Sequence, residues 1–181
     1  HYDLKGKHAL LSPSSSAWLR YDDDKLITFV GRSDAAKRGT DIHAWACESI
    51  RLGIRQSRSK KALYAYVNDA LTLNMIPEQS LYYSDNCFGT VDAIGFDGRL
   101  LRIHDLKTGT SMTYEDNSKD MEQLIVYAAL FCLEYFVDPT KIDIELRVYQ
   151  YEEAVIFVPS PEEVLEVMSI IEHHDKMICQ I

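Results

Sequence analysis

The sequence predicts an α/β fold in which a mixed central β-sheet is flanked by helices. Asp97-Gly98 stands between two apolar runs, which is typical of a β-hairpin. Residues 142–150 alternate apolar and polar side chains, as a half-exposed strand does, and stretches on both sides of these strands carry apolar residues at helical spacing. Because helical and strand patterns interleave along the chain, we expect a layered mixed fold.

Each further element follows from its local pattern. We expect helices over residues 12–19, 33–52, 59–73, 118–137 and 160–174, strands over residues 26–30, 81–83, 142–150 and 154–158 besides the hairpin in 89–109, and an exposed loop over the three aspartates 22–24. Ser12-Pro13 and Ser160-Pro161 each place an N-cap residue before a proline, and Glu163 completes a capping box with Ser160.

Length and charge limit the class of protein. The 181 residues suffice for one domain, which we expect to span 1–181, and no apolar run is long enough to cross a bilayer. No signal peptide opens the sequence, so we expect a cytoplasmic location, with further residues preceding His1. The net charge of −9 excludes a surface that binds nucleic acid throughout, because phosphate binding needs clustered Lys and Arg.

One basic cluster can still form a local groove. Its members are Arg51, Arg55, Arg58, Lys60 and Lys61. Two interpretations stay open for it: contact with DNA, or an ordinary solvated helix face and loop.

The cysteines and the adjacent histidines carry no metal motif. The cysteines are scattered without a C-x-x-C pair, so we expect them to be reduced and buried, with no disulfide framework, zinc site or iron–sulfur cluster; they are Cys47, Cys87, Cys132 and Cys179. His173 and His174 point in different directions on a helix, so we expect both on the surface.

The hairpin places two carboxylates and a lysine on one face. A two-residue turn at 97–98 pairs Asp92 with Ile103, two residues before Asp105. Since the side-chain period of a strand is two, Asp92, Asp105 and Lys107 share a face. The two aspartates are then diagonal neighbours, with Cα atoms roughly 7–8 Å apart. Their mutual repulsion would be relieved by a hard cation such as Mg²⁺.

This arrangement suits metal-assisted hydrolysis of a phosphodiester. Carboxylates hold the ion, the ion lowers the pKa of a bound water, and the lysine orients that water or helps to deprotonate it. The sequence has no phosphate-binding P-loop, no G-x-S-x-G elbow and no H-E-x-x-H helix. A D-x-K triplet by itself is weak evidence, because it arises often by chance.

Three further polar residues have open interpretations. His43 lies in a predicted helix, where a lone histidine is more often a core or boundary residue than a ligand. Gln123 and Tyr127 are four apart on one helix face, and both could equally lie at the rim of the core.

Four ordered segments carry a family resemblance: G-T-D-I-H at 39–43, G-T-V-D at 89–92, D-L-K-T-G at 105–109 and Q-L-I-V-Y-A at 123–128. In this order they resemble the motifs of RecB-type nucleases in the PD-(D/E)XK superfamily. The S-P-S-S-S-A-W-L segment at 12–19 is similar to the start of phage-encoded members. The resemblance covers residues 12 to about 130 and implies a restriction-endonuclease-like core.

The resemblance implies a role for each motif residue. The implied metal ligands are His43, Asp92, Asp105 and the backbone carbonyl of Leu106. The implied catalytic residues are Asp92, Asp105, Lys107, Gln123 and Tyr127, with the last two lining the site and positioning DNA or the lysine.

Two features depart from the family pattern. The proline of the superfamily name is absent before Asp92, and the four cysteines of iron–sulfur relatives are not matched. Glu48 stands five residues after His43, which rotates it off the histidine's face, so we expect it to cap the helix or to pair with Arg51 or Arg55.

The resemblance implies a DNA nuclease dependent on Mg²⁺ or Mn²⁺. We expect an exonuclease of phage or bacterial DNA recombination or replication, acting in the bacterial or phage-infected cell. DNA is the expected partner, a homo-oligomer and a recombination protein are open as further partners, and no membrane is expected. Two alternatives stay open: a catalytically silent DNA-binding or assembly protein, and a site- or structure-specific endonuclease.

Overall fold

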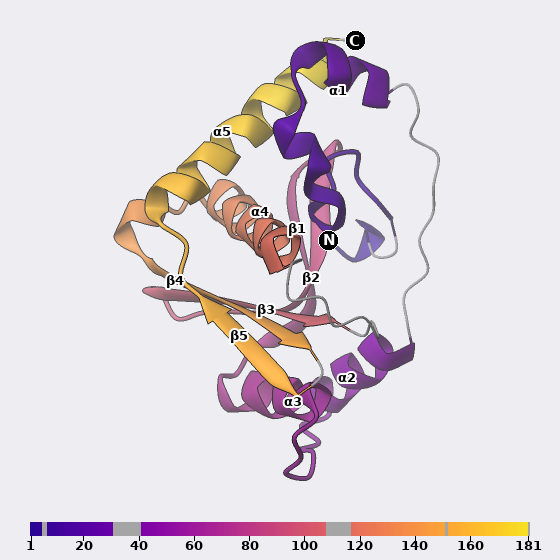
Figure 1. Ribbon diagram of the computed structural model, residues 1–181, viewed down its shortest axis with the longest axis vertical. Helices are drawn as coiled ribbons and strands as arrows, with labels where there is room; N and C mark the ends of the chain where they lie inside the picture. Colours follow the sequence, from indigo (N-terminus) through magenta and orange to yellow (C-terminus); the bar gives the residue numbers. More distant parts are fainter. Residues whose placement is uncertain (5–6, 31–40, 108–116, 151, 181) are drawn as a thin grey trace.

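The protein is built on a five-stranded mixed sheet with the strand order β1-β2-β3-β4-β5 (Figure 1). The computed structural model describes residues 1–4, 7–30, 41–107, 117–150 and 152–180. The strands are β1 (Ile76–Ser84), β2 (Cys87–Phe96), β3 (Leu100–Lys107), β4 (Asp143–Gln150) and β5 (Glu153–Phe157). Among these described strands, β3 and β4 pair in parallel and the other neighbours are antiparallel.

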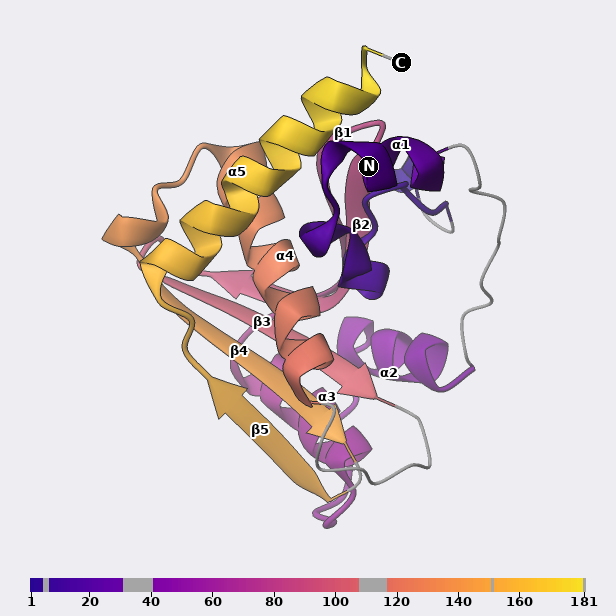
Figure 2. The ribbon, with the colours of Figure 1, turned by 45° about the horizontal axis from the view of Figure 1, so that its top comes forward.

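Helices cover both faces of this sheet, which confirms the predicted α/β class (Figure 2). One face carries α2 (Asp41–Arg51) and α3 (Ala62–Thr72). The other carries α4 (Asn117–Tyr135), with α5 (Pro161–Ile178) packed upon it. The remaining helices are η1 (Tyr2–Leu4), η2 (Pro13–Arg20), α1 (Asp23–Val30) and η3 (Pro139–Lys141).

The crossover helix α4 is buried along most of its length. A parallel β3–β4 pair requires a long connection, and α4 supplies it between the sheet, α5 and η2. Five consecutive side chains from Val126 to Leu130 are buried, which explains why α4 is apolar on more than one side. The elements around α4 are therefore held by one continuous core.

Side chains of β3 point alternately to the two cores. Leu101 and Ile103 lie in the cluster under α4, whereas Leu106 lies in the cluster under α2 and α3. Asp105 and Lys107 continue the alternation of Leu101 and Ile103, so their side chains point to the α4 side. The predicted shared face of these two residues is confirmed by their common partner on α4, Gln123.

The predicted two-residue turn of the hairpin is wrong. The first ladder pair joins Phe96 and Leu101, so four residues, 97–100, lie between its two members instead of the predicted two. The Asp97 carboxylate accepts hydrogen bonds from the backbone N–H groups of Arg99 (2.9 Å) and Leu100 (2.8 Å), which stabilises the longer loop. The register shifts by two residues and therefore keeps every side chain on its predicted face.

The predicted strand over residues 26–30 is also wrong, because these residues belong to α1. The Asp22 carboxylate accepts a hydrogen bond from the Lys25 N–H (2.8 Å), and the Asp22 carbonyl accepts one from Leu26. Asp23 and Asp24 lie in the first turn, where carboxylates interact favourably with the helix dipole. The acidic run starts a helix rather than forming a loop.

The helix-start predictions are confirmed in part. Ser160 and Glu163 make the predicted capping box. Residues 13–20 are helical but of the 3₁₀ type, and the Ser12 hydroxyl bonds to Ser14 instead of capping. The predicted helix over 33–52 is described only from Asp41, since 31–40 lie outside the described residues.

Buried groups at α5 correct one further expectation. His173 is exposed as predicted, but His174 is buried and its Nε2 lies 3.1 Å from the Trp18 carbonyl oxygen. Cys47, Cys87 and Cys132 are buried as predicted, whereas Cys179 is exposed. Within the described ranges, none of the helices has the length and apolarity that a bilayer crossing would need.

His104 on β3 should make the fold sensitive to acid. It is fully buried, and neither ring nitrogen has a hydrogen-bond partner among the described residues. Burial lowers its pKa to about 3, assisted by the charges of Arg147 and Arg102. The unfolded chain binds this proton near pH 6.5, so stability falls as pH drops below that value.

We expect the parent protein to lose about 2 kcal/mol of unfolding free energy through His104 between pH 7 and pH 5. Urea titrations of the parent and of His104→Phe at both pH values measure this loss. The variant should show the smaller pH dependence, because phenylalanine has no proton to bind. Equal pH dependence in the two proteins would contradict the expectation.

Candidate functional site

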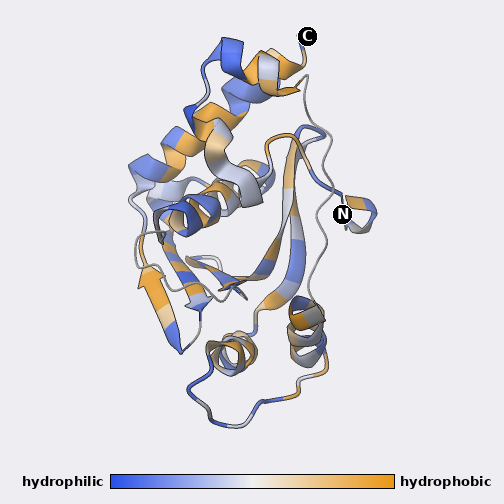
Figure 3. Ribbon diagram, turned by 45° about the vertical axis from the view of Figure 1, so that its right-hand side comes forward, coloured by the Kyte–Doolittle hydropathy of each residue, from blue (hydrophilic) through white to orange (hydrophobic). Residues whose placement is uncertain are grey.

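The candidate site lies where β2 separates from β3. The ladder ends with the pair Ala93 and His104, so Asp92 and Asp105 come next as directly opposed residues, not as the predicted diagonal neighbours. On the other edge of β2, the β1–β2 ladder skips Glu78, which has a φ of 49°. A left-handed glutamate is strained, and such strain is often retained at functional sites. Figure 3 shows the β1–β2 hairpin continuing past the rest of the sheet.

At Leu106, where β3 no longer pairs with β2, two side chains bond to the backbone groups instead. The Leu106 backbone N–H donates to Asp92 Oδ2 (2.8 Å), and its carbonyl oxygen accepts from His43 Nε2 (2.7 Å). These backbone groups would otherwise need β2 as their partner. His43 Nε2 also lies 3.6 Å from Asp92 Oδ2. The structure therefore brings three of the sequence-predicted metal ligands together.

Asp105 is 5 % exposed and is held from two sides. Its Oδ1 accepts a hydrogen bond from Gln123 Nε2 (3.2 Å). Its Oδ2 forms an ion pair with Lys107 Nζ (3.0 Å), in a geometry that gives this oxygen no hydrogen bond. One oxygen of Asp105 thus has only an ionic partner among the described residues.

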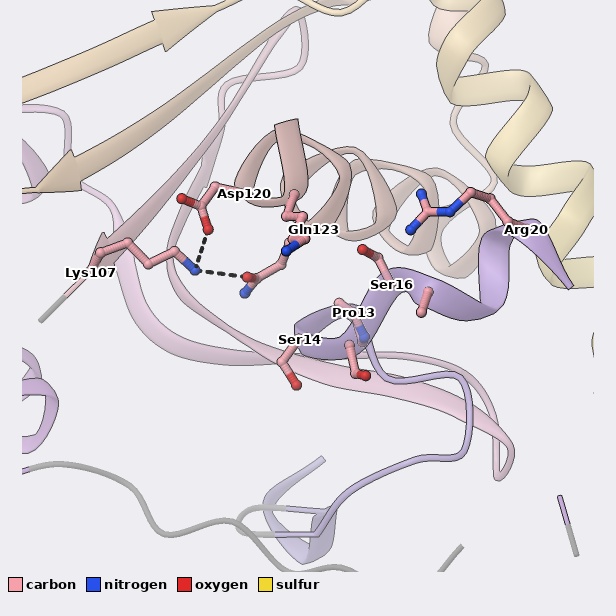
Figure 4. Close-up of a pocket in the computed structure, with 10 residues that line it drawn as sticks. Pro13, Ser14, Ser16, Arg20, Lys107, Asp120 and Gln123 are labelled. Atoms are coloured by element: carbon pink, nitrogen blue, oxygen red, sulfur yellow. Dashed lines mark hydrogen bonds and ion pairs between the residues drawn. The ribbon is translucent and has the colours of Figure 1, made fainter. Parts of the chain in front are cut away.

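The Lys107 ammonium sits between three oxygens, and Figure 4 shows those of Asp120 and Gln123. Gln123 Oε1 is at 2.9 Å, Asp105 Oδ2 at 3.0 Å and Asp120 Oδ1 at 3.1 Å. Burial alone would lower the pKa of Lys107, but the charges of Asp105 and Asp120 outweigh it and hold the pKa above its usual value. Lys107 is therefore charged at neutral pH.

Asp120 is the site residue that sequence reasoning missed. Asp120, Gln123 and Tyr127 are spaced by three and then four residues on α4, so they share one stripe of the helix. Extending the Gln123–Tyr127 face by one turn towards the N-terminus would have found it.

Tyr127 acts on the site through β2. Its buried hydroxyl donates to the Thr90 carbonyl (2.6 Å), two residues before Asp92. A Cβ at Gly89 would lie 2.8 Å from Pro13 and 3.1 Å from Tyr127, so only glycine allows η2, β2 and α4 to meet here. Tyr127 fixes the strand that carries Asp92; contact with DNA stays a prediction.

The two carboxylates repel each other in a poorly solvated place. Burial raises the pKa of Asp92 to about 7, and the charge of Asp105 adds to the rise, while His43 acts in the opposite direction. Burial also raises the pKa of Asp105, against the effect of Lys107. Tyr66 of α3 lies in the same field, since its pKa is raised by burial and by both aspartates.

The donor set fits a hard divalent cation. Among the described residues no three His, Cys, Asp or Glu side chains stand close enough to form a ready-made metal cluster, so His43, Asp92 and Asp105 would have to draw together around an ion. The two carboxylates and the Leu106 carbonyl are oxygen donors of the kind that Mg²⁺ takes beside its waters, and His43 Nε2 would join them only in the tautomer that does not donate to Leu106. Adjacent ligands of octahedral Mg²⁺ lie about 3 Å apart. The spacings of 2.7 Å and 3.6 Å around His43 Nε2 lie on either side of this value.

A polar pocket of about 340 Å³ opens beside Lys107, between η2 and α4 (Figure 4). The residues lining it are Pro13, Ser14, Ser15, Ser16, Ala17, Arg20, Lys107, Lys119, Asp120 and Gln123. Glu122 ties the two walls together, since it accepts from Ser16 (3.1 Å) and pairs with Arg20 (2.6 Å). Hydroxyl and cationic groups of this kind suit a phosphate-bearing ligand.

The predicted basic cluster begins at the last residue of α2 and continues along the connection to α3. Its five members are exposed; they are Arg51, Arg55, Arg58, Lys60 and Lys61. Arg51 pairs with Glu78 (3.7 Å) and not with the exposed Glu48, and Arg55 donates to the Thr72 hydroxyl (3.1 Å). A role in DNA binding stays a prediction for all five.

No protein-family model matches this chain, and comparison with curated proteins gives no match.

Asp92→Asn should stabilise the metal-free protein. Because the pKa of Asp92 is raised in the folded protein, ionisation of this carboxyl lowers the free energy of unfolding as pH rises from about 4 to about 7. The full loss is present above that range. Asparagine carries no charge and can still accept the Leu106 N–H. At pH 8 with a chelator we expect the unfolding free energy to rise by about 1–3 kcal/mol.

Denaturant titrations at pH 4 and pH 8 test this expectation. The gain should be small at pH 4, because there Asp92 is protonated in the folded parent and only about half ionised in the unfolded chain. Glu152→Gln, which removes an exposed carboxylate before β5, is the matched control. A variant that is destabilised equally at both pH values would contradict the proposed charge repulsion.

Proposed function

We propose that this protein is a metal-dependent DNA nuclease that hydrolyses phosphodiester bonds with Mg²⁺ or Mn²⁺. The observation that carries the proposal is the pair of neighbouring carboxylates, half-buried Asp92 and buried Asp105, beside an ion-paired lysine and the His43–Leu106 contact. Carboxylates crowded in this way are stabilised by a cation between them. A lysine next to such an ion is suited to act on a charged phosphoryl group.

His43, Asp92, Asp105 and the Leu106 carbonyl would hold the ion. A bound ion would supply Lewis-acid polarisation of a phosphoryl oxygen and a more acidic water. Lys107 is charged, which favours it as a donor to a phosphate oxygen or to the attacking water rather than as the base that takes the proton. Gln123 bonds to both Asp105 and Lys107 and so fixes their spacing.

DNA as substrate is supported by three features. The pocket beside Lys107 is lined by hydroxyl and cationic groups, the α2–α3 connection is basic, and the ordered motifs resemble RecB-type nucleases. Exonuclease action, a place in phage or bacterial recombination or replication, and a restriction-endonuclease-like core rest on the motif resemblance alone.

Asp105→Ala and Lys107→Ala should each lower Mg²⁺-dependent digestion of linear DNA by roughly 100-fold or more, because the first removes a ligand of the ion and the second removes the charged donor beside the phosphate. The assay follows end-labelled linear DNA and closed circular DNA over time, with and without chelator. Lys141→Ala, an exposed lysine remote from the site, is the matched control and should digest DNA like the parent.

The substrates separate the alternatives. Digestion of linear but not closed circular DNA supports an exonuclease, and cleavage of the circle supports an endonuclease. DNA binding without digestion would indicate a silent binding protein. Unchanged digestion by both variants would overturn the proposed site.

A further inference from the structure

Lys107 has two carboxylate partners on different elements. Asp105 belongs to β3 and to the proposed metal site, whereas Asp120 belongs to the first turn of α4. The Nζ–oxygen distances are nearly equal, at 3.0 Å and 3.1 Å. The ammonium therefore bridges the site to a carboxylate outside the proposed ligand set.

This bridge sets up competition at Asp105. Its Oδ2 faces the ammonium, so a divalent cation that binds Asp105 must approach a positive charge or draw the carboxylate away from it. The Lys107 side chain is only 26 % exposed. Water by itself would therefore solvate the ammonium poorly if the Asp105 carboxylate turned to a metal. It needs another partner within reach.

The geometry points to Asp120 as a positioning residue that retains the Lys107 ammonium when Asp105 binds the metal. This inference rests on the proposed metal site. Asp120 is well placed for the role, because it sits on a helix fixed by the core and lines the pocket into which Lys107 also points. Gln123 Oε1 supports the same ammonium from the next helical turn.

Two other roles for Asp120 predict different behaviour. As a direct ligand, or as a distant negative charge, Asp120 would favour the metal whether or not Lys107 is present. As the retaining partner of Lys107, it favours the metal only when the ammonium is there to compete. A double-mutant cycle of Asp120 and Lys107 therefore separates the retaining role from the other two roles.

The experiment is calorimetric titration of Mn²⁺ and of Mg²⁺ into four proteins: the parent, Asp120→Asn, Lys107→Met and the double variant. We expect Asp120→Asn to weaken metal binding by about 3- to 10-fold in the parent background and by less than about 2-fold in the Lys107→Met background. Asp120→Glu should recover most of the affinity, because it keeps the carboxylate. Thermal unfolding of each variant confirms that it is folded.

Three outcomes would overturn the inference. They are an equal loss in both backgrounds, no loss in the parent background, and no metal binding by the parent. If the cycle behaves as expected but the parent digests no DNA, the inference stands and the nuclease proposal fails. In an active enzyme, Asp120→Asn at saturating metal should lower kcat more than it changes KM, since Lys107 would lose its orientation rather than a contact with substrate.

Discussion

The site depends on the break in the ladder between β2 and β3. Pairing stops at Ala93 and His104, and the backbone groups of Leu106 are satisfied by Asp92 and His43 instead of by a strand. A buried backbone donor or acceptor must find a partner, so this break and these two side chains require each other. The strained φ of Glu78 on the neighbouring strand lies at the same level of the sheet.

Charge is balanced locally rather than by solvent. Asp92 and Asp105 face each other, and the described residues supply Lys107 as the principal compensating cation for Asp105. Lys107 in turn is shared with Asp120 and Gln123. A network of this kind is stable only if each member keeps a partner, so a change at one position is transmitted to the others. The metal-free protein thus retains unfavourable charge repulsion that an ion could remove.

Rigid packing holds these groups in place. Tyr127 ties α4 to β2, Gly89 lets η2 approach both, and the buried centre of α4 fixes the helix stripe that carries Asp120 and Gln123. Side chains on helices and strands are positioned more precisely than side chains on loops.

The sequence alone determined what depends on local periodicity. Alternation placed Asp92, Asp105 and Lys107 on one face, and a two-residue error in register could not change that result because the strand period is two. Helical spacing placed Gln123 and Tyr127 on one stripe. Four consecutive residues, 160–163, were enough to predict the capping box of Ser160 and Glu163. The α/β class followed from the same patterns.

Only the tertiary structure decided which elements meet. The Asp97 side chain lengthened the hairpin loop, the Asp22 carboxylate started a helix where a strand was expected, and His174 was buried by Trp18. His43 belongs to the site because it bonds to Leu106, 63 positions later in the chain. Asp120 belongs to it because it pairs with Lys107. These contacts join residues whose separation carries no period, so no local pattern could report them; they follow from how the helices pack on the sheet.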